Sequence, residues 1–188
     1  NEEYIQSAAV SVNAGFTALK TGLFNAVNLI DTPAFVQAAV DKFAAIRNAV
    51  GPQVDVGIDF HGRVSPAMAI RLARALEPYH PMFIEEPVLP ENVDALVTVA
   101  RSTSIPIATG ERLFTKWGFR EVLEKQAAVV LQPDLSHAGG ILECKKIAAM
   151  AECYYAAVAP HCPLGPIALA ACLQLDASIP NFLVQEHV

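Results

Sequence analysis

Basic residues are scarce in this sequence, and they do not gather into a patch. Among its 188 residues, Lys and Arg number 13 against 19 Asp and Glu, and the formal net charge is -6. Proteins that bind nucleic acid usually carry a basic stripe or patch that neutralises phosphates. The sequence therefore predicts that nucleic acid is not a partner.

A long uninterrupted apolar run is also missing. The most apolar stretch, residues 156–173, is broken by three prolines and a histidine, whereas a membrane-spanning helix needs about 20 consecutive apolar residues. The first ten residues, NEEYIQSAAV, are acidic, unlike the basic start of a secretion signal. We therefore expect no membrane segment and a cytoplasmic location.

Paired-cysteine motifs are absent as well. The chain has four cysteines, but none forms a C-x-x-C pair, and their spacings suit neither a zinc knuckle nor a disulfide framework. We interpret all four as reduced and mostly buried thiols: Cys144, Cys153, Cys162 and Cys172.

What the sequence does contain is a regular alternation of strand-like and helical segments. Apolar runs end in a polar residue, and a loop and a helical pattern follow each of the first five. These end residues recur every 23 to 27 positions: Asp59, Glu85, Glu111, Asp134, His161 and Glu186. The run at 15–20 reads as an earlier strand, which a helix over residues 2–13 precedes.

This alternation predicts the fold class. A helical segment begins at Ser65 and Pro66, which suit an N-cap and a first helical position, and another covers residues 136–154. Strands alternating with helices form right-handed βαβ crossovers and a parallel sheet. An open doubly wound sheet would satisfy the pattern. A (β/α)8 TIM-type barrel is favoured, because no Gly-x-Gly-x-x-Gly turn follows a strand and the polar residues all fall at carboxyl ends.

The count of strands is one short of a closed barrel. Seven strand-like runs can be found where closure needs eight, and the sequence stops just after the last of them. We expect residues 1–188 to be a single but partial catalytic barrel domain whose first strand lies outside this sequence.

Three acids end consecutive strands of the predicted barrel: Asp59, Glu85 and Glu111. Carboxylates that converge without basic partners repel one another and raise one another's pKa values. A hard cation removes this repulsion, and Mg²⁺ suits a site of three carboxylates because it keeps places for water or substrate. Alternatively, each acid caps a helix or pairs with an arginine such as Arg63 or Arg112. The regular spacing favours the metal site. Spacing does not distinguish Glu85 from Glu86, whose side chains point to opposite faces of a strand. Glu85 is taken as the ligand on the family resemblance described below, with Glu86 in a supporting or capping role.

Two histidines also fall at strand ends, where they could serve as acid and base. His61 follows Asp59 by two positions, so strand alternation would point both side chains the same way. His161 ends the strand after that of Asp134, whose carboxylate could orient the imidazole and raise its basicity. The alternatives are a structural, hydrogen-bonded histidine and a helix N-cap at Asp134. We interpret Asp134 and His161 as a paired base.

The motifs together resemble a known family. They are DFHGR (59–63), FIEEPV (83–88), ATGERLF (108–114), LQPDLSHAGGI (131–141), APHCPLGPIALAA (159–171) and QE (185–186). In combination they are similar to the acid-sugar dehydratases of the enolase superfamily, in its mandelate racemase branch. The resemblance covers most of the chain from about residue 15 onward.

The resemblance implies a modified TIM barrel, preceded in the family by an α+β capping domain that this sequence lacks. It implies Mg²⁺ held at Asp59, Glu85 and Glu111, a small-molecule sugar acid as substrate, and a homo-oligomer. His161, paired with Asp134, would remove the C2 proton to give an enediolate. His61 would protonate the departing 3-hydroxyl, and Glu186 would hydrogen-bond the substrate carboxylate or the enediolate.

Other functions stay open at this point. Branch members often carry Lys-x-Lys at the end of the second strand, but here Lys20 stands alone, which fits a histidine-based dehydratase better than a racemase. A different sugar acid, a racemase on this scaffold, a Schiff-base aldolase using Lys20, and a non-catalytic truncated homologue are the alternatives.

Overall fold

The computed structural model describes residues 2–187, which divide into two compact units. The first unit contains the described residues up to Leu89 together with Thr98–Pro106. The second contains Pro90–Val97 and the described residues from Ile107 onward. Helix α4 (Val93–Ala100) carries the chain across this division. The expectation of one barrel domain over 1–188 stays a prediction.

The first unit holds three parallel strands. They are β1 (Ala18–Thr21), β2 (Asp55–Asp59) and β3 (Ile84–Glu85). Strand β1 pairs with β2, and β2 pairs with β3 so that Asp59 lies opposite Glu85. Gly57 in β2 lies under an aromatic ring, because a Cβ there would come within 2.7 Å of Phe83. The register thus brings two acids to the carboxyl end of neighbouring strands.

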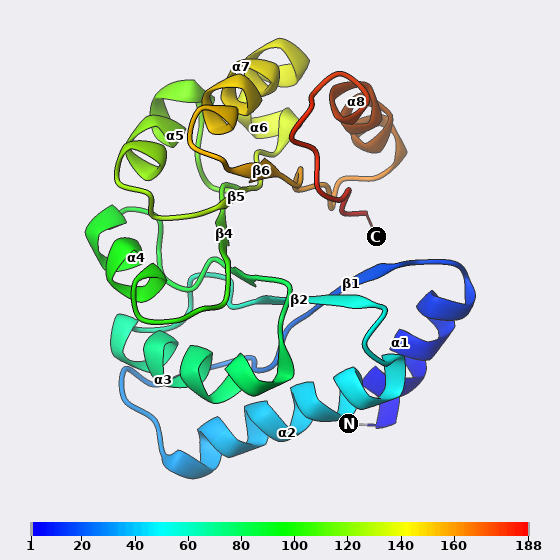
Figure 1. The fold of residues 1–188 in the computed structure, drawn as a ribbon, viewed down its shortest axis with the longest axis vertical. Coiled ribbons are helices and arrows are strands. Elements are labelled where there is room, and N and C mark those ends of the chain that lie inside the picture. The colour runs from blue at the N-terminus through cyan, green and yellow to red at the C-terminus, as the bar shows by residue number, and fades with distance from the viewer. Residues whose placement is uncertain (1, 188) are drawn as a thin grey trace. The chain divides into compact units, whose positions relative to one another are not determined.

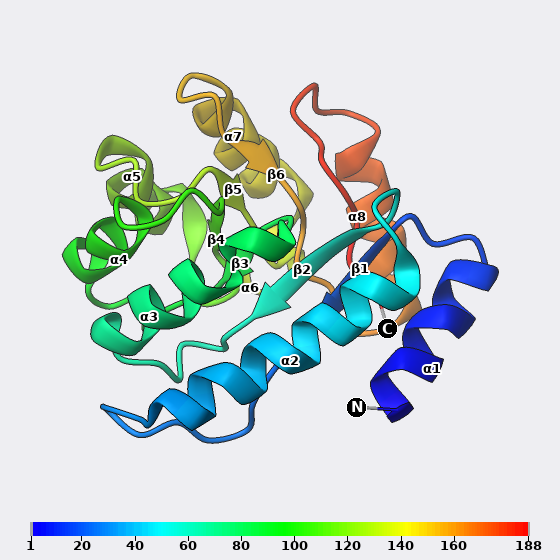
Figure 2. The ribbon, with the colours of Figure 1, turned by 60° about the horizontal axis from the view of Figure 1, so that its bottom comes forward.

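Helices cover this first set of strands. They are α1 (Glu2–Asn13), α2 (Pro33–Val50), α3 (Pro66–Leu76) and the 3-10 turn η1 (Glu77–Tyr79). Figures 1 and 2 show α2 running alongside β1 and β2, with α1 beside it. The core between helices and strands is apolar and closed to solvent, with Phe43, Val56, Ile58, Leu72, Leu76 and Ile84 all at 0% exposure. Each such side chain contributes roughly 1.5–3 kcal/mol on burial.

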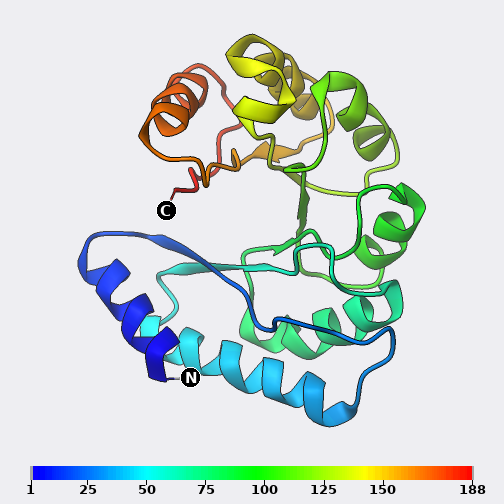
Figure 3. The same ribbon diagram turned by 180° about the vertical axis from the view of Figure 1, so that it is seen from behind.

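The second unit repeats the pattern with β4 (Ile107–Thr109), β5 (Val130–Leu131) and β6 (Ala157–Val158). These strands are parallel, and β5 pairs with both β4 and β6. The helices are α5 (Thr115–Glu124), α6 (Leu135–Ala138), α7 (Gly140–Glu152) and α8 (Pro166–Asp176). Helix α7 packs against both α5 and α8 (Figure 3).

The predicted alternation of strand and helix is therefore confirmed, and each strand pair described above is parallel. This is the βα repeat from which (β/α)8 barrels are built. The predicted N-cap of α3 is also confirmed, since the Ser65 hydroxyl accepts from the backbone N–H of Met68 at 3.3 Å and Pro66 begins the helix.

Two predicted elements differ from the structure. The helix expected over 136–154 is broken into α6 and α7 at Gly139, whose φ of 117° is a left-handed conformation that ends a helix. The expected seventh strand, which ends at Glu186, is only one parallel bridge between Val158 and Phe182 among the described residues. Its backbone still pairs with β6, because Val158 donates to Asn181 and accepts from Leu183, both at 2.8 Å.

No helix among residues 2–187 combines the length and the apolarity that crossing a membrane requires.

Candidate active site

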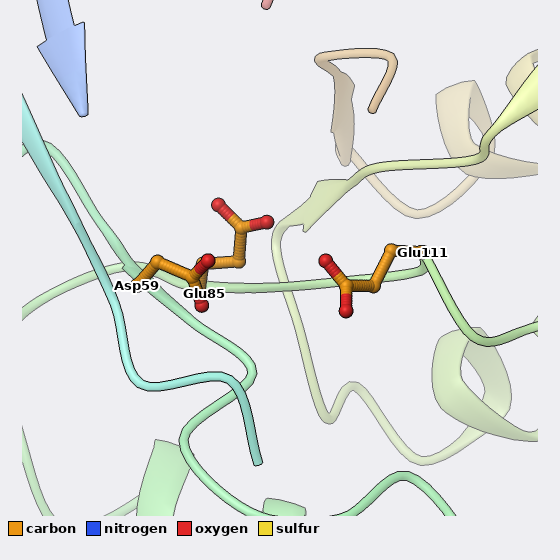
Figure 4. A group of neighbouring side chains, drawn as sticks. All are labelled: Asp59, Glu85 and Glu111. Atoms are coloured by element: carbon orange, nitrogen blue, oxygen red, sulfur yellow. The ribbon is translucent and has the colours of Figure 1, made fainter. Parts of the chain in front are cut away.

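In the first unit, two acids meet at the carboxyl ends of β2 and β3. Asp59 is the last residue of β2 and Glu85 the last of β3, and they are partners in the parallel register. Figure 4 shows their side chains beside each other. Asp59 is 6% exposed and Glu85 is 0% exposed. Two buried carboxylates this close need compensating positive charge to stay ionised.

Lys20 contributes part of that positive charge. Its Nζ lies 2.9 Å from Oε1 and 2.8 Å from Oε2 of Glu85, and 3.9 Å from Oδ2 of Asp59. The expectation of acids without basic partners is therefore wrong for this pair. The contact was missed because Lys20 is 65 residues from Glu85 in the sequence, and only the β1–β2–β3 register brings their ends together.

His61 lies close to Asp59, although not through strand alternation. It follows the end of β2 in a turn with φ of 53°, and its backbone N–H donates to Asp59 Oδ1 at 2.7 Å. Its ring Nε2 lies 2.9 Å from Asp59 Oδ2, and its side chain is 42% exposed. The predicted proximity of the two side chains is thus observed, but a left-handed turn produces it.

In the second unit, Glu111 follows β4 by two residues. The glycine before it permits a close approach of two backbone segments, because a Cβ at Gly110 would lie 2.8 Å from the backbone of Gln132. Glu111 Oε1 accepts from Arg112 Nε at 3.2 Å, so the arginine pairing given above as the alternative is present here. Its other oxygen, Oε2, lies 3.3 Å from His161 Nε2.

The predicted pair of Asp134 and His161 is present in the geometry. Asp134 Oδ2 lies 2.9 Å from His161 Nδ1, and the two residues also form a parallel bridge that continues the β5–β6 ladder. Asp134 Oδ1 accepts from the backbone N–H of Ser136 at 2.8 Å and caps α6. The helix cap and the histidine contact therefore coexist, because each uses a different carboxylate oxygen. Asp134 is 2% exposed, which fixes the carboxylate.

Glu186 contacts the backbone next to this histidine. Its Oε2 accepts from the backbone N–H of Cys162, the residue after His161, at 3.1 Å. Gln185 Nε2 donates to the carbonyl of Pro160 at 3.1 Å, so the 185–186 segment brackets the histidine on both sides along the chain. This arrangement restrains the loop that carries the imidazole.

The three acids provide the ligand chemistry of a metal site. Asp59 and Glu85 belong to the first unit and Glu111 to the second, and Figure 4 labels all three carboxylate side chains. Carboxylate oxygens suit a hard divalent cation such as Mg²⁺ or Mn²⁺.

The cysteines do not take part in this chemistry. Cys144, Cys162 and Cys172 are buried and Cys153 is exposed, and all four are free thiols. Burial raises the pKa of the Cys144 and Cys172 thiols to about 12, so they stay protonated and unreactive near neutral pH. This agrees with the interpretation as reduced, mostly buried residues.

Comparison with known proteins relates the chain to one family. The family described as Enolase C-terminal domain-like matches residues 3–188. Two curated relatives carry the name D-galactonate dehydratase. The protein from Variovorax paradoxus (strain S110) is 52% identical over 98% of this chain, and the protein from Ralstonia pickettii (strain 12J) is 54% identical over 94%. The chain spans about half the length of these relatives, 48% in each case.

Solved structures show the same likeness. A member of the enolase superfamily from Salmonella Typhimurium matches with a TM-score of 0.94 and 37% identity, over 99% of this chain and 50% of the other. A mandelate racemase/muconate lactonizing enzyme-like protein from Rubrobacter xylanophilus DSM 9941 matches with a TM-score of 0.94 and 40% identity, over 99% of this chain and 50% of the other.

Proposed function

Because the chain belongs to the enolase C-terminal domain-like family and has its β/α-barrel type of fold, we propose that it is the catalytic part of an Mg²⁺-dependent hydro-lyase. The substrate is a sugar acid, which loses water to give a 2-keto-3-deoxy acid. The observation that carries the proposal is the Asp134–His161 pair, with a carboxylate on one ring nitrogen at 2.9 Å and the other nitrogen directed at Glu111.

Asp59, Glu85 and Glu111 fit a divalent cation. The fit is supported by the donor set, which is made only of carboxylates, and by the ammonium group that already lies against two of the three acids. Bound there, Mg²⁺ would stabilise the negative charge that builds on the substrate carboxylate when the adjacent C–H bond breaks. The remaining steps fall to side chains of this chain.

His161 is the proposed base. Because Asp134 Oδ2 accepts at Nδ1, the neutral imidazole carries its proton on Nδ1 and presents a lone pair at Nε2. In the proposed reaction, Nε2 takes the proton from C2 of the sugar acid. Asp134 stabilises the resulting imidazolium without itself accepting the proton, as in other carboxylate–histidine pairs. A general base of this kind contributes about 10²–10⁴-fold in rate.

His61 and Glu186 complete the proposed chemistry. Hydroxide is a poor leaving group, so the 3-hydroxyl must gain a proton as its C–O bond breaks. The His61 side chain is 42% exposed and its Nε2 lies 2.9 Å from Asp59 Oδ2. His61 is therefore the proposed donor of the proton that this step needs. Glu186, as the carboxylic acid, would donate a hydrogen bond to the substrate carboxylate or the enediolate. The enol product then tautomerises to the keto acid.

D-galactonate is the proposed substrate, because the two curated relatives at 52% and 54% identity bear the name D-galactonate dehydratase. A homo-oligomer, which rests on the family resemblance alone, and a cytoplasmic location are further parts of the proposal.

The test is a panel of aldonic acids assayed at the length of the curated relatives, which are about twice as long as this chain. Formation of 2-keto-3-deoxy product is followed with Mg²⁺ and with EDTA. We expect turnover of D-galactonate above that of its epimers, and loss of turnover with EDTA. Interconversion of C2 epimers without loss of water would instead identify a racemase and refute the dehydration.

A further inference from the structure

Lys20 occupies a position that the proposed reaction does not explain. It lies near the end of β1, and its Nζ contacts both oxygens of Glu85 at 2.8 and 2.9 Å and Asp59 Oδ2 at 3.9 Å. The Lys20 side chain is 23% exposed, whereas the acids are almost fully buried. The contacts are therefore made where solvent screening is weak.

The two acids need this ammonium when no metal ion is bound. Burial disfavours an ionised carboxylate, and two neighbouring carboxylates disfavour each other's ionisation. Glu85 is 0% exposed and Asp59 6%, so water compensates little of their charge. A cation at 2.8 Å from Glu85 and 3.9 Å from Asp59 offsets both effects.

The same ammonium conflicts with a bound divalent cation. Mg²⁺ binds carboxylate oxygens at about 2.0–2.1 Å and requires nearly octahedral geometry. Lys20 Nζ lies on the oxygens of Glu85 that such an ion would need, so the two cations would compete for one carboxylate and repel each other.

We propose that Lys20 is the resident counter-cation of Asp59 and Glu85 in the metal-free protein, and that its ammonium must leave Glu85 when Mg²⁺ binds. This inference rests on the proposed metal site. It makes Lys20 the group that compensates the charge of two buried acids in the absence of metal and that weakens the affinity of the site for Mg²⁺.

Removing Lys20 ends its competition with Mg²⁺ for Glu85, and this effect on Mg²⁺ affinity outweighs any loss of order in the two acids. Glu85 and Asp59 are fixed by the β2–β3 register and by burial, and Asp59 also accepts from the backbone of His61 at 2.7 Å. The ligands therefore keep their positions without the lysine. In wild type, Mg²⁺ must break the contact between the Lys20 ammonium and Glu85 before it binds. Without that contact, the affinity of the site for Mg²⁺ should be on the order of tenfold tighter.

The experiment compares Lys20→Met with Lys42→Met. Lys42 is a matched control in the same unit, because its Nζ donates to the Gly22 carbonyl at 2.8 Å and lies 3.4 Å above the Tyr4 ring, contacts that involve no carboxylate. Calorimetric titration with MgCl₂ measures affinity, and thermal unfolding is recorded in EDTA and in saturating Mg²⁺. If Lys20→Met does not fold in EDTA, Lys20→Gln, which keeps a neutral donor, replaces it.

Lys20→Met is expected to bind Mg²⁺ on the order of tenfold more tightly than wild type, with Lys42→Met unchanged. In EDTA, the thermal unfolding midpoint of Lys20→Met should lie below that of Lys42→Met. Adding Mg²⁺ should raise the midpoint of Lys20→Met by more than it raises that of Lys42→Met. Equal or weaker binding by Lys20→Met, beside normal binding by wild type, overturns the role of Lys20 and leaves the proposed function standing. Failure of wild type to bind Mg²⁺ overturns both.

Discussion

Asp134→Asn separates the two uses of the Asp134 carboxylate. Oδ1 caps α6 through the Ser136 N–H at 2.8 Å, and Oδ2 holds His161 Nδ1 at 2.9 Å. Asparagine retains an oxygen for the cap but presents an NH₂ donor to the histidine. The imidazole must then accept at Nδ1 and carry its proton on Nε2, where the lone pair of the proposed base is needed.

The size of the effect follows from this geometry. Loss of one general base lowers kcat by about 10²–10⁴-fold, which corresponds to about 3–5 kcal/mol of barrier. The cap is kept, so the unfolding free energy should fall by less than about 1 kcal/mol. Asp134→Ala removes both contacts. Its unfolding free energy should be lower than that of Asp134→Asn by about 0.5–2 kcal/mol, the usual loss for a removed N-cap.

The assay pairs kcat for keto-acid formation with urea unfolding for the Asn and Ala variants. A matched KM for wild type and Asp134→Asn would show that substrate still binds. Turnover of Asp134→Asn within threefold of wild type would refute the tautomer argument. Equal destabilisation by Asn and Ala would refute the assignment of the cap to Oδ1.

Three further predictions concern stability. Burial raises the pKa of Asp176 to about 6, so the wild-type protein should lose stability as pH rises from about 4 through 6. At pH 8, urea unfolding should show that Asp176→Asn has an unfolding free energy higher than wild type by on the order of 2 kcal/mol. Equal unfolding free energies at pH 8 would contradict this. Hydrogen bonds from α5 and α7 lower the pKa of Glu143 to about 2, so its contribution is present above about pH 4.5 and is lost as pH falls towards 2. Glu143→Gln should therefore flatten that acid limb in a pH series of melting curves. Gly110→Ala should lose about 1–3 kcal/mol because its Cβ would meet the Gln132 backbone at 2.8 Å, whereas Gly22→Ala, with nothing within 4 Å, is the control.

Local sequence chemistry was enough to predict much of the fold. Ser65 and Pro66 identify the start of α3, because an N-cap and a first-turn proline act within a few residues. The spacing of polar residues also predicted the βα repeat. The break at Gly139 was missed, because a glycine inside an apolar helical pattern can be tolerated or can end the helix.

The candidate site was less fully predictable. The pairing of Asp134 with His161 follows from neighbouring parallel strands, so strand order alone suggested it. The contact of Lys20 with Glu85 depends on the exact register of β1, β2 and β3, which no local pattern encodes. The position of His61 depends on a left-handed turn after β2, where strand alternation no longer applies.

The central claim is that His161 removes a proton from a sugar acid at a site where acids hold Mg²⁺. His161→Asn tests it most directly, with Mg²⁺ titration and D-galactonate turnover measured on the same preparation at the length of the curated relatives. The account predicts that Mg²⁺ binding is retained while turnover falls by at least about 10²-fold. Retained turnover in this variant would contradict it.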